Sequence, residues 1–338
     1  MVKFNNNARH IISLQENMTA KRIFITGAAG FIGFHTARFL QQRGDQVLGY
    51  DNFNSYYDPL LKQARAVELG KQGITVIKGD LNNREALQRA IEGHQTTHIL
   101  HLAAQAGVRY SLDNPQAYLQ SNIEGFLSIL EICRKHPQIP LIYASSSSVY
   151  GLNQKIPFSI TDRTDHQASL YGVTKKTNEL MAHSYHHLFG LSVTGLRFFT
   201  VYGPWGRPDM AYFLFTKAIL DNKPIDIYNH GKMLRDFTYI DDIAEVTAAA
   251  IDRSLPHATF NLGNNRPEEL LKLISILEKE LGKKAQTNLL PMQPGDVVST
   301  YADISESTAQ LNFSPKISLE EGIAKFVKWY KDFYKIKI

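Results

Sequence analysis

Residues 22–33 read RIFITGAAGFIG, a short β-rich run followed by a glycine-rich turn. Gly27, Gly30 and Gly33 have the spacing GxxGxxG, and an apolar helical pattern continues from them to about Arg43. Glycines between a strand and a helix allow a tight turn and let the backbone approach a pyrophosphate at the helix N-terminus. The stretch therefore predicts the strand, turn and helix that open a dinucleotide-binding fold.

A second β-rich run covers residues 46–51 and ends in Asp51. Asp51 follows Gly33 at close to the ~20-residue spacing expected for a carboxylate that holds the hydroxyls of a ribose. No arginine follows Asp51 directly, so the sequence favours NAD over NADP. The alternative interpretation of Asp51 is an acidic turn residue that only ends the strand.

Strands and helices continue to alternate along the chain beyond Asp51. The expected strands cover residues 75–78, 97–101, 141–145 and 191–198, and the expected long helices cover residues 115–136 and 171–190. Such alternation predicts an α/β fold with a doubly wound parallel sheet, and the ligand of such a sheet binds at the carboxyl ends of its strands.

Composition along the chain predicts three parts. Residues 1–20 are polar and Asn-rich, and we expect them to form a flexible arm, with Met18 as a possible natural start. Residues 21–200 are expected to form an NAD-binding domain, to which the chain returns near residues 236–263. Residues 201–338 are expected to form mainly a second, smaller substrate-binding domain.

Charge and cysteine content exclude several partners. The formal net charge is +5, from 37 basic and 32 acidic residues, and the basic residues are scattered, which argues against nucleic-acid binding. Cys133 is the single cysteine, so no disulfide can form within the chain, as is typical of a cytoplasmic protein. No apolar run approaches the ~18 residues of a membrane span, so we expect no membrane partner.

Tyr171 and Lys175 lie four residues apart at the start of a predicted helix and therefore share one face of it. An ammonium group beside a phenol lowers the phenol's pKa, which is ordinarily near ~10. This pairing makes Tyr171 a candidate base or acid at neutral pH. An exposed structural pair is the more common meaning of this spacing, but the glycine turn and the polar strand ends ahead of it favour catalysis.

A histidine-rich stretch lies further along the same helix. Glu179, His183 and His187 recur at helical spacing and are compatible in type with a metal site. The HExxH pattern is absent, and a solvated or interfacial helix face explains the same spacing, so we expect no metal.

Four longer motifs identify a family. They are AQAGVRYS at 104–111, ASSSSVYG at 144–151, RFFTVYGPWGRPDM at 197–210 and RDFTYIDD at 235–242. With the glycine turn, Tyr171 and Lys175, the chain resembles the extended short-chain dehydrogenase/reductase superfamily from about residue 21 to its C-terminus. Within that superfamily the four motifs look like those of the UDP-glucuronate 4-epimerases.

The resemblance implies a tightly bound NAD that is regenerated in each cycle, a UDP-sugar substrate, and a homodimer formed through the helices near 115–136 and 171–190. It implies that Tyr171 is the base, that Lys175 binds the nicotinamide ribose, and that Ser146 places its hydroxyl beside the sugar C4 oxygen. The implied cofactor-binding residues are Gly27, Gly30, Phe31, Ile32, Gly33, Asp51, Asn52, Asp80, Leu81, Leu102, Ala103, Ala104, Gln105, Asn122, Ser145, Tyr171 and Lys175. The resemblance implies that Arg235 clamps the pyrophosphate of UDP, and we expect the substrate also to be bound by Arg109, Ser147, Ser148, Thr200, Arg207 and Asp296.

The serine run separates related reactions. Related 4,6-dehydratases carry Thr-Asp-Glu where this chain has Ser146, Ser147 and Ser148, and UDP-glucuronate decarboxylases typically carry Glu at the position of Ser148. Neutral-hexose epimerases usually carry Asn at the position of Thr200. We expect Ser147, Ser148 and Thr200, with Arg207 or Arg109, to hold a sugar carboxylate by hydrogen bonds and so prevent decarboxylation of a 4-keto sugar.

One departure from the family and two alternatives stay open. Related UDP-hexose epimerases carry a second arginine before a Gly-Asp pair, whereas residues 292–296 read MQPGD, and Arg207 is a candidate replacement. The alternative functions are a UDP-glucose or UDP-N-acetylglucosamine 4-epimerase, and a non-catalytic NAD-binding regulator. Turnover, and its loss in Tyr171→Phe, would distinguish an enzyme from a regulator.

Overall fold

The glycine-rich stretch forms the predicted strand, turn and helix. The computed structural model describes residues 20–292 and 299–336, and in it β1 (Arg22–Thr26) leads through the turn into α2 (Phe31–Gln42). Gly27 has φ 72°, and a Cβ on Gly33 would lie 2.2 Å from the Gly27 carbonyl oxygen. Only glycine fits these two positions, because any side chain would push the helix away from the turn.

A parallel seven-stranded sheet, of order β10-β6-β5-β4-β1-β2-β3, lies at the centre of the molecule. Its other strands are β2 (Gln46–Asp51), β3 (Thr75–Lys78), β4 (His98–His101), β5 (Leu141–Ser146), β6 (Val193–Phe198) and β10 (His257–Leu262). The fold class predicted from the alternation of strands and helices is confirmed. The first and last residues of each predicted strand lie within two residues of those of the observed strand.

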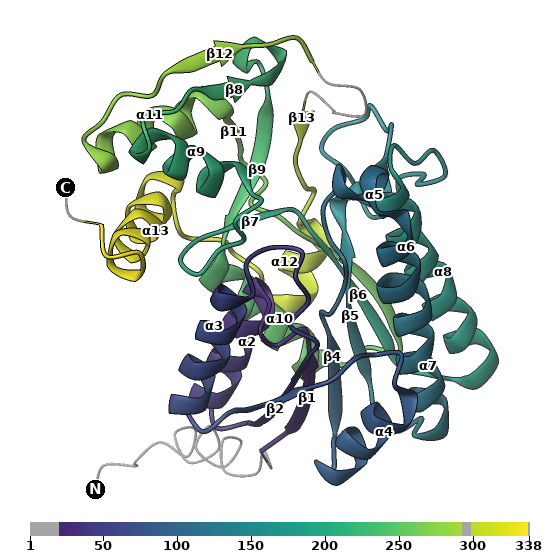
Figure 1. Cartoon of the computed structure of the whole chain (residues 1–338). Helices are drawn as coiled ribbons and strands as arrows, with labels where there is room; N and C mark the ends of the chain where they lie inside the picture. Colours follow the sequence, from purple (N-terminus) through teal and green to yellow (C-terminus); the bar gives the residue numbers. More distant parts are fainter. Residues whose placement is uncertain (1–19, 293–298, 337–338) are drawn as a thin grey trace, which may run out of the picture.

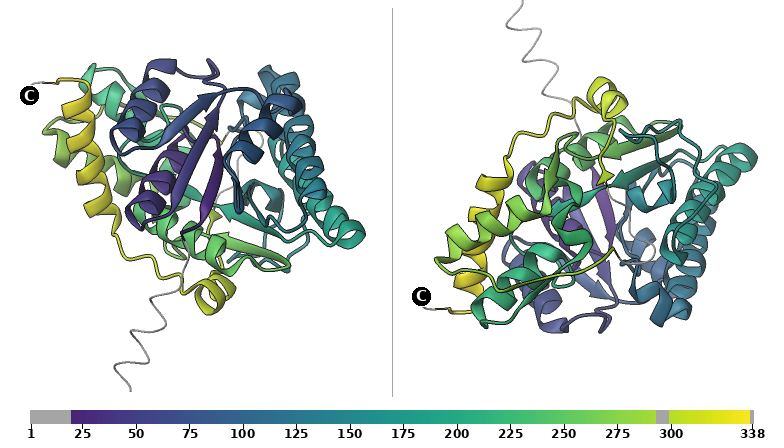
Figure 2. Two further views of the ribbon diagram at one scale, coloured as in Figure 1. Left: turned by 90° about the horizontal axis from the view of Figure 1, so that it is seen from below. Right: turned by 90° about the horizontal axis from the view of Figure 1, so that it is seen from above.

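Helices cover both faces of this sheet, as Figures 1 and 2 show. On one face α2 packs against α3 (Pro59–Lys71) and α10 (Ile240–Arg253), and on the other α7 (Gly125–Lys135) packs against α8 (Leu170–Phe189). Each face buries its own apolar cluster against the sheet, and α4 (Arg84–Gly93) completes the second layer. No helix within residues 20–292 or 299–336 combines the length and apolar character needed to cross a bilayer.

The long helix expected over residues 115–136 is divided in the structure. A separate short helix, α5 (Tyr110–Asp113), precedes it. The expected helix itself begins as α6 (Pro115–Tyr118), continues directly as a π-helical turn, η1 (Leu119–Glu124), and ends as α7. The π turn contains Asn122, whose side chain bonds to a neighbouring loop rather than facing solvent. The division is therefore caused by a tertiary contact, which the helical periodicity of the sequence does not reveal.

A smaller unit covers the carboxyl edge of the main sheet. Its strands β11 (Pro267–Glu269), β9 (Leu234–Tyr239) and β13 (Ser299–Thr300) form one sheet with β7 (Thr200–Tyr202), and β8 (Ile225–Ile227) pairs with β12 (Thr287–Leu289). Helices α9 (Ala211–Leu220), α11 (Leu270–Leu281) and α13 (Leu319–Phe333) pack together beside them (Figure 1). β9 belongs to this unit, whereas α10 and β10 lie with the main sheet.

Candidate active site

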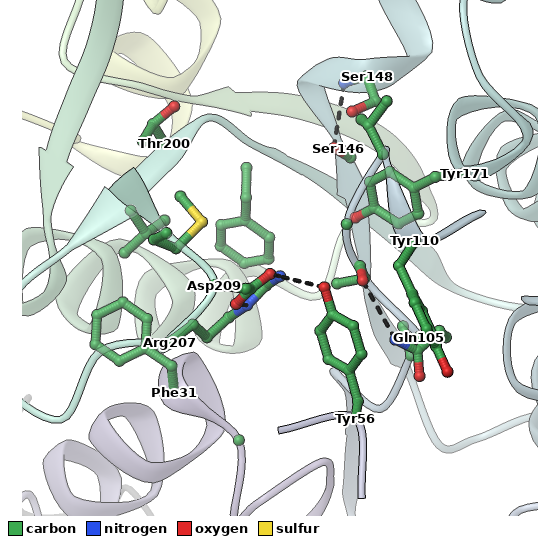
Figure 3. Close-up of a pocket in the computed structure, with 18 of the residues that line it drawn as sticks. Phe31, Tyr56, Gln105, Tyr110, Ser146, Ser148, Tyr171, Thr200, Arg207 and Asp209 are labelled. Carbon is green, nitrogen blue, oxygen red and sulfur yellow. Dashed lines mark hydrogen bonds and ion pairs between the residues drawn. The ribbon is translucent and has the colours of Figure 1, made fainter. Parts of the chain in front are cut away.

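A cavity of about 1190 Å³ lies between the carboxyl ends of the main strands and the smaller unit. All of the predicted cofactor and substrate residues line it except two. Asn122 lies behind its wall, and Asp296 falls outside the residues that the structure describes. The polar residues that sequence patterns placed at separate strand ends therefore meet in one cavity, part of which is drawn in Figure 3.

The glycine turn forms one end of the cavity. A Cβ on Gly27 would lie 2.7 Å from the Ala103 backbone nitrogen, so the turn packs directly against the segment that follows β4. Asp51 accepts hydrogen bonds from the backbone N–H groups of Ala29 at 3.0 Å and Phe53 at 2.8 Å. The side-chain-free glycine turn and the helix N-terminus suit the diphosphate of a dinucleotide, and the carboxylate at the end of β2 suits its ribose.

Two further predicted residues, Asn52 and Asp80, also bond to each other in this part of the cavity. The Asn52 amide donates to an Asp80 carboxylate oxygen at 3.0 Å, which joins the end of β2 to the segment after β3.

Burial raises the pKa of Asp51, and the hydrogen bonds from Phe53 and Ala29 and the charge of Lys62 oppose that rise. The polar groups at this end are thus held in place before any ligand binds.

Tyr171 and Lys175 lie in the first turns of α8 and face the opposite end of the cavity. Ser169 caps this helix by accepting a hydrogen bond from the Gly172 N–H at 3.1 Å. The buried Lys175 ammonium donates to the Ala144 carbonyl at 2.9 Å, and burial lowers the pKa of Lys175 to about 8. The shared helix face predicted from the sequence is thus present, with Lys175 anchored to the end of β5.

The predicted lowering of the Tyr171 pKa by Lys175 is wrong for the protein's own groups. Burial raises the pKa of Tyr171, and the influences that lower it are a hydrogen bond with Ser146 and the charge of Arg207. The physical reason is that desolvation penalises a buried phenolate, and this effect exceeds the lowering by Ser146 and Arg207. Proton transfer at Tyr171 therefore depends on Ser146 and on charges brought into the cavity.

The four serines that end β5 have different surroundings. The Ser145 hydroxyl donates to Glu179 at 2.7 Å, away from any ligand, so only its backbone is available to the cavity. The Ser146 hydroxyl accepts from the Ser148 N–H at 3.1 Å, as the upper part of Figure 3 shows. Ser147 and Ser148 lie in η2 (Ser147–Tyr150), a 3-10 turn that lines the cavity.

A buried ion pair lies behind Ser145 and Lys175. Arg197 on β6 donates to both carboxylate oxygens of Glu179, at 2.8 and 2.9 Å. Burial acts to raise the pKa of Glu179, but the hydrogen bonds and the charge of Arg197 hold that pKa low. From the sequence, Glu179 is a candidate only for a metal site. Within residues 20–292 and 299–336, no group of three or more His, Cys, Asp or Glu side chains is arranged to hold a metal ion.

Asn122 positions the loop that follows β4. Its amide oxygen accepts from the Gln105 N–H at 2.8 Å, and its amide nitrogen donates to the Gln105 carbonyl and the Thr174 hydroxyl, both at 3.0 Å. All of these partners belong to the protein. Asn122 thus shapes the Leu102–Gln105 wall of the cavity from behind.

The side of the cavity nearest the smaller unit contains an ion pair that the sequence reveals only in part. Arg207, which is predicted, bonds to Asp209, which is not, and the Nε to Oδ1 distance is 3.0 Å. The Tyr56 hydroxyl donates to the same carboxylate at 3.0 Å, and Figure 3 shows its ring between Asp209 and Tyr110. The available sequence signal is an aromatic pair, Tyr56-Tyr57, placed directly after the Asn-rich loop that follows Asp51.

The other predicted arginines also line this side. The Arg109 guanidinium carbon lies 5.1 Å from the centre of the Tyr228 ring, a cation–π contact. Arg235, on β9, donates to the Leu234 carbonyl at 2.9 Å. The cavity therefore joins a glycine-rich end, a Tyr–Ser–Lys centre and an arginine-lined end that suits an anionic ligand.

Comparisons with known proteins agree with this arrangement. The family model described as "NAD dependent epimerase/dehydratase family" matches residues 23–263. UDP-glucuronate 4-epimerase 1 of Arabidopsis thaliana is 51% identical over 330 residues, which cover 92% of this chain and 77% of that protein.

Two solved structures have the same fold. The UDP-glucuronic acid 4-epimerase from Bacillus cereus, in complex with UDP-glucuronic acid and NAD, matches with a TM-score of 0.84 and 36% identity, over 92% of this chain and 99% of that chain. The UDP-glucose 4-epimerase of Thermotoga maritima, with UDP-glucose, matches with a TM-score of 0.83 and 29% identity, over the same shares. From its glycine turn to β10, this chain belongs to the NAD dependent epimerase/dehydratase family.

Proposed function

We propose that this protein is an NAD-dependent UDP-glucuronate 4-epimerase that interconverts UDP-glucuronate and UDP-galacturonate. The observation that carries the proposal is that one cavity is lined by Tyr171 and Ser146 together with Ser147, Ser148 and Thr200. That lining offers a proton acceptor and several hydroxyls, but no carboxyl residue at the serine turn to promote elimination or decarboxylation. Relatives named UDP-glucuronate 4-epimerase, identical at about half of the positions, support the same substrate.

The glycine turn, Asp51 and Lys175 are the groups that would hold NAD. Bound NAD supplies a hydride acceptor, and because the hydride returns to the sugar the cofactor is regenerated in each cycle. Ala29, Asp51 and Gly27 are fixed by their own hydrogen bonds and close packing, so the cradle is built by the protein alone. Such preorganisation favours a cofactor that stays bound between turnovers.

We propose that Tyr171 accepts the proton of the sugar C4 hydroxyl and later returns it to the C4 oxygen, after the 4-keto sugar has turned so that the hydride returns to the opposite face of C4. Ser146 assists because its hydrogen bond with Tyr171 favours the phenolate. Arg207 contributes a positive charge that acts in the same direction, although Asp209 beside it partly cancels that charge. Lys175, which donates to the Ala144 carbonyl, would bind the nicotinamide ribose through its remaining N–H groups.

Retention of the carboxylate is the special demand of this substrate. Oxidation at C4 makes a β-keto acid, and β-keto acids readily lose CO₂. In that side reaction the C5–C6 bond breaks, its electrons form an enolate with the C4 carbonyl, and CO₂ leaves. The carboxylate would be held as an anion by hydrogen bonds from the hydroxyl groups of Ser147, Ser148 and Thr200 and by the guanidinium of Arg207 or Arg109. These contacts would disfavour the loss of CO₂. This arrangement favours an acid sugar over the alternatives, UDP-glucose and UDP-N-acetylglucosamine.

A non-catalytic NAD-binding regulator is the second alternative. Proteins that only sense a cofactor do not need a buried base with a hydrogen-bonding hydroxyl beside it. Here Tyr171, Ser146 and Lys175 are all present, and all line the same cavity. Catalysis is therefore the favoured interpretation of the site.

We also propose a cytoplasmic location, which fits the single cysteine of the chain, Cys133, because it is buried and unpaired.

We further propose that the protein forms a homodimer through the helices near 115–136 and 171–190. Several large apolar side chains are exposed on and beside these helices: Leu112 (76%), Leu119 (42%), Val173 (42%), Leu180 (56%) and Leu188 (66%). Val173, Leu180 and Leu188 belong to α8, which forms one flank of the molecule with α6 and α7 in Figure 1. Burial of such a row in a helix-on-helix interface would remove it from water.

The first test is proton NMR of the purified protein with UDP-glucuronate and no added NAD. We expect UDP-galacturonate to accumulate, because the cofactor copurifies and is regenerated. Tyr171→Phe, which keeps the ring but removes the proton acceptor, should lower the rate by about 1,000-fold or more. Formation of a UDP-pentose as the main product would contradict the proposed role of the serine turn.

The carboxylate-binding role is tested with the double variant Ser148→Ala, Thr200→Ala. Fewer hydrogen bonds to the carboxylate should raise the UDP-4-keto-pentose fraction of the products about tenfold, measured by NMR or chromatography. Thr308→Ala is the matched control, since the Thr308 hydroxyl donates to the Phe313 carbonyl and neither residue lines the cavity. Unchanged product purity in the double variant would refute the assignment.

The role of Ser146 is tested by the pH dependence of kcat. Tyr171 must be deprotonated to act as base, and its hydrogen bond with Ser146 lowers its pKa. Ser146→Ala therefore raises that pKa and moves the rising limb of the profile to higher pH, so that kcat at a fixed pH on this limb falls by about tenfold. Ser145→Ala should leave the limb in place, because the Ser145 hydroxyl serves Glu179.

The dimer is tested by sedimentation velocity of Leu180→Glu. A buried carboxylate without a partner opposes association, so we expect the variant to sediment as a monomer at concentrations where the natural protein is dimeric. Leu60→Glu is the control, because Leu60 is 65% exposed on α3, on the far side of the sheet. A dimeric Leu180→Glu protein would place the interface elsewhere.

A further inference from the structure

Arg65 is a fully buried arginine that does not line the cavity. It lies on α3 with 0% of its surface exposed, and the cavity wall in front of it is formed by Tyr57 and Lys62. Both cations lie over the Tyr57 ring, with Lys62 at 4.7 Å and Arg65 at 5.8 Å from the ring centre. Arg65 has no role in the proposed proton transfer, and it is not one of the residues proposed to hold NAD.

The Arg65 guanidinium connects two segments that are far apart in the sequence. Its Nη1 donates to the Ala29 carbonyl, in the glycine turn, at 3.0 Å, and to the Tyr57 hydroxyl at 2.8 Å. On its other side, Nη2 donates to the Trp205 carbonyl at 2.6 Å and the Gly206 carbonyl at 3.0 Å, and Nε also reaches Trp205 at 3.1 Å. One side chain thus bridges the cofactor turn and the loop that leads into Arg207.

The loop held by Arg65 has a backbone that needs external support. Gly203 has φ 142° and Trp205 has φ 60°, and the latter is a left-handed conformation that L residues with large side chains rarely adopt. The loop then presents Arg207 and Asp209 to the cavity. Carbonyl groups turned inward at Trp205 and Gly206 would be unpaired without Arg65, so the guanidinium fixes the loop in this shape.

Arginine is the residue type that this position requires. All of its hydrogen-bond acceptors here are neutral, namely three backbone carbonyls and a phenol, so neutralising a contacting carboxylate is not its purpose. A planar fork of five N–H groups can reach acceptors on opposite sides at once, whereas a lysine ammonium concentrates its donors at one point.

The residues next to Tyr57 make a second connection in the same direction. Tyr56 donates to Asp209 at 3.0 Å, so consecutive residues hold the substrate-side loop, Tyr56 directly and Tyr57 through Arg65. The segment between β2 and α3 therefore contacts the glycine turn and the Trp205–Asp209 loop together. A displacement of either one would be transmitted to the other.

We propose that Arg65 is a positioning residue that fixes the Trp205–Arg207 loop against the NAD-binding turn, so that cofactor retention and substrate binding depend on one side chain outside the cavity. The substrate half of this inference rests on the proposed function. The cofactor half does not, because it concerns only the Ala29 carbonyl and the glycine turn.

The test compares Arg65→Met with the natural protein and with Arg43→Met. Arg43 also makes several polar contacts, to Asp45 and Asp252, but it lies at the end of α2 remote from the cavity. We expect Arg65→Met to retain about fivefold less NAD per chain after gel filtration, and to raise KM for UDP-glucuronate about tenfold more than it lowers kcat. Arg43→Met should match the natural protein in both measurements.

A double-mutant cycle with Arg207→Lys separates positioning from general destabilisation. If Arg65 acts through Arg207, adding Arg65→Met to Arg207→Lys should change KM by less than about twofold, whereas a general loss of structure would multiply the two effects. Arg207→Lys alone should keep its NAD. Multiplicative effects on KM, or an Arg65→Met protein with natural NAD content and KM, would overturn the inference.

A second variant and a second measurement test the role of Arg65 if Arg65→Met does not fold or if the natural protein is inactive on UDP-glucuronate. If Arg65→Met does not accumulate as folded protein, Arg65→Lys, which keeps the charge, takes its place and should show the same losses, because an ammonium cannot span both loops. If the natural protein retains NAD but does not turn over UDP-glucuronate, the proposed function fails. The Arg65 inference is then decided by NAD retention and by UDP binding measured calorimetrically in the same variants.

Discussion

The buried ion pair between Glu179 and Arg197 fixes the reactive helix to the sheet. Glu179 lies one turn beyond Lys175 on α8, and Arg197 lies on β6, so their two hydrogen bonds set the distance between helix and sheet. The Ser145 hydroxyl joins the same carboxylate, which draws the end of β5 into the arrangement. Loss of one partner from such a pair typically costs about 3–5 kcal/mol, since the other charge remains buried. The positions of Tyr171, Ser146 and Lys175 all depend on this contact.

Much of the fold could be predicted because its signals are local. The glycine turn, the strands and the shared face of Tyr171 and Lys175 follow from spacings of a few residues, which backbone geometry converts directly into structure. The cavity lining was also largely predictable, because parallel strands bring their carboxyl ends to one edge. Contacts between distant segments, such as Asn122 with Gln105, leave no such periodic signal.

The electrostatics of the site could not be read from spacing alone. The raised pKa of Tyr171 follows from the burial of its side chain, and burial is a property of the assembled fold. Asp209 lies two residues from Arg207, and only the folded loop shows that it pairs with Arg207 and Tyr56. Adjacent serines likewise diverge, because the chain changes from strand to 3-10 turn between them.

The chain passes between its two units several times rather than once. It leaves the main sheet after β6, returns with α10 and β10, leaves again for β11 and α11, and returns through α12 (Ser305–Leu311) before α13. Multiple crossings remove the single hinge about which two domains could swing apart. The cavity thus lies between parts that are connected at several points of the chain, and to widen it several of these connections must move together.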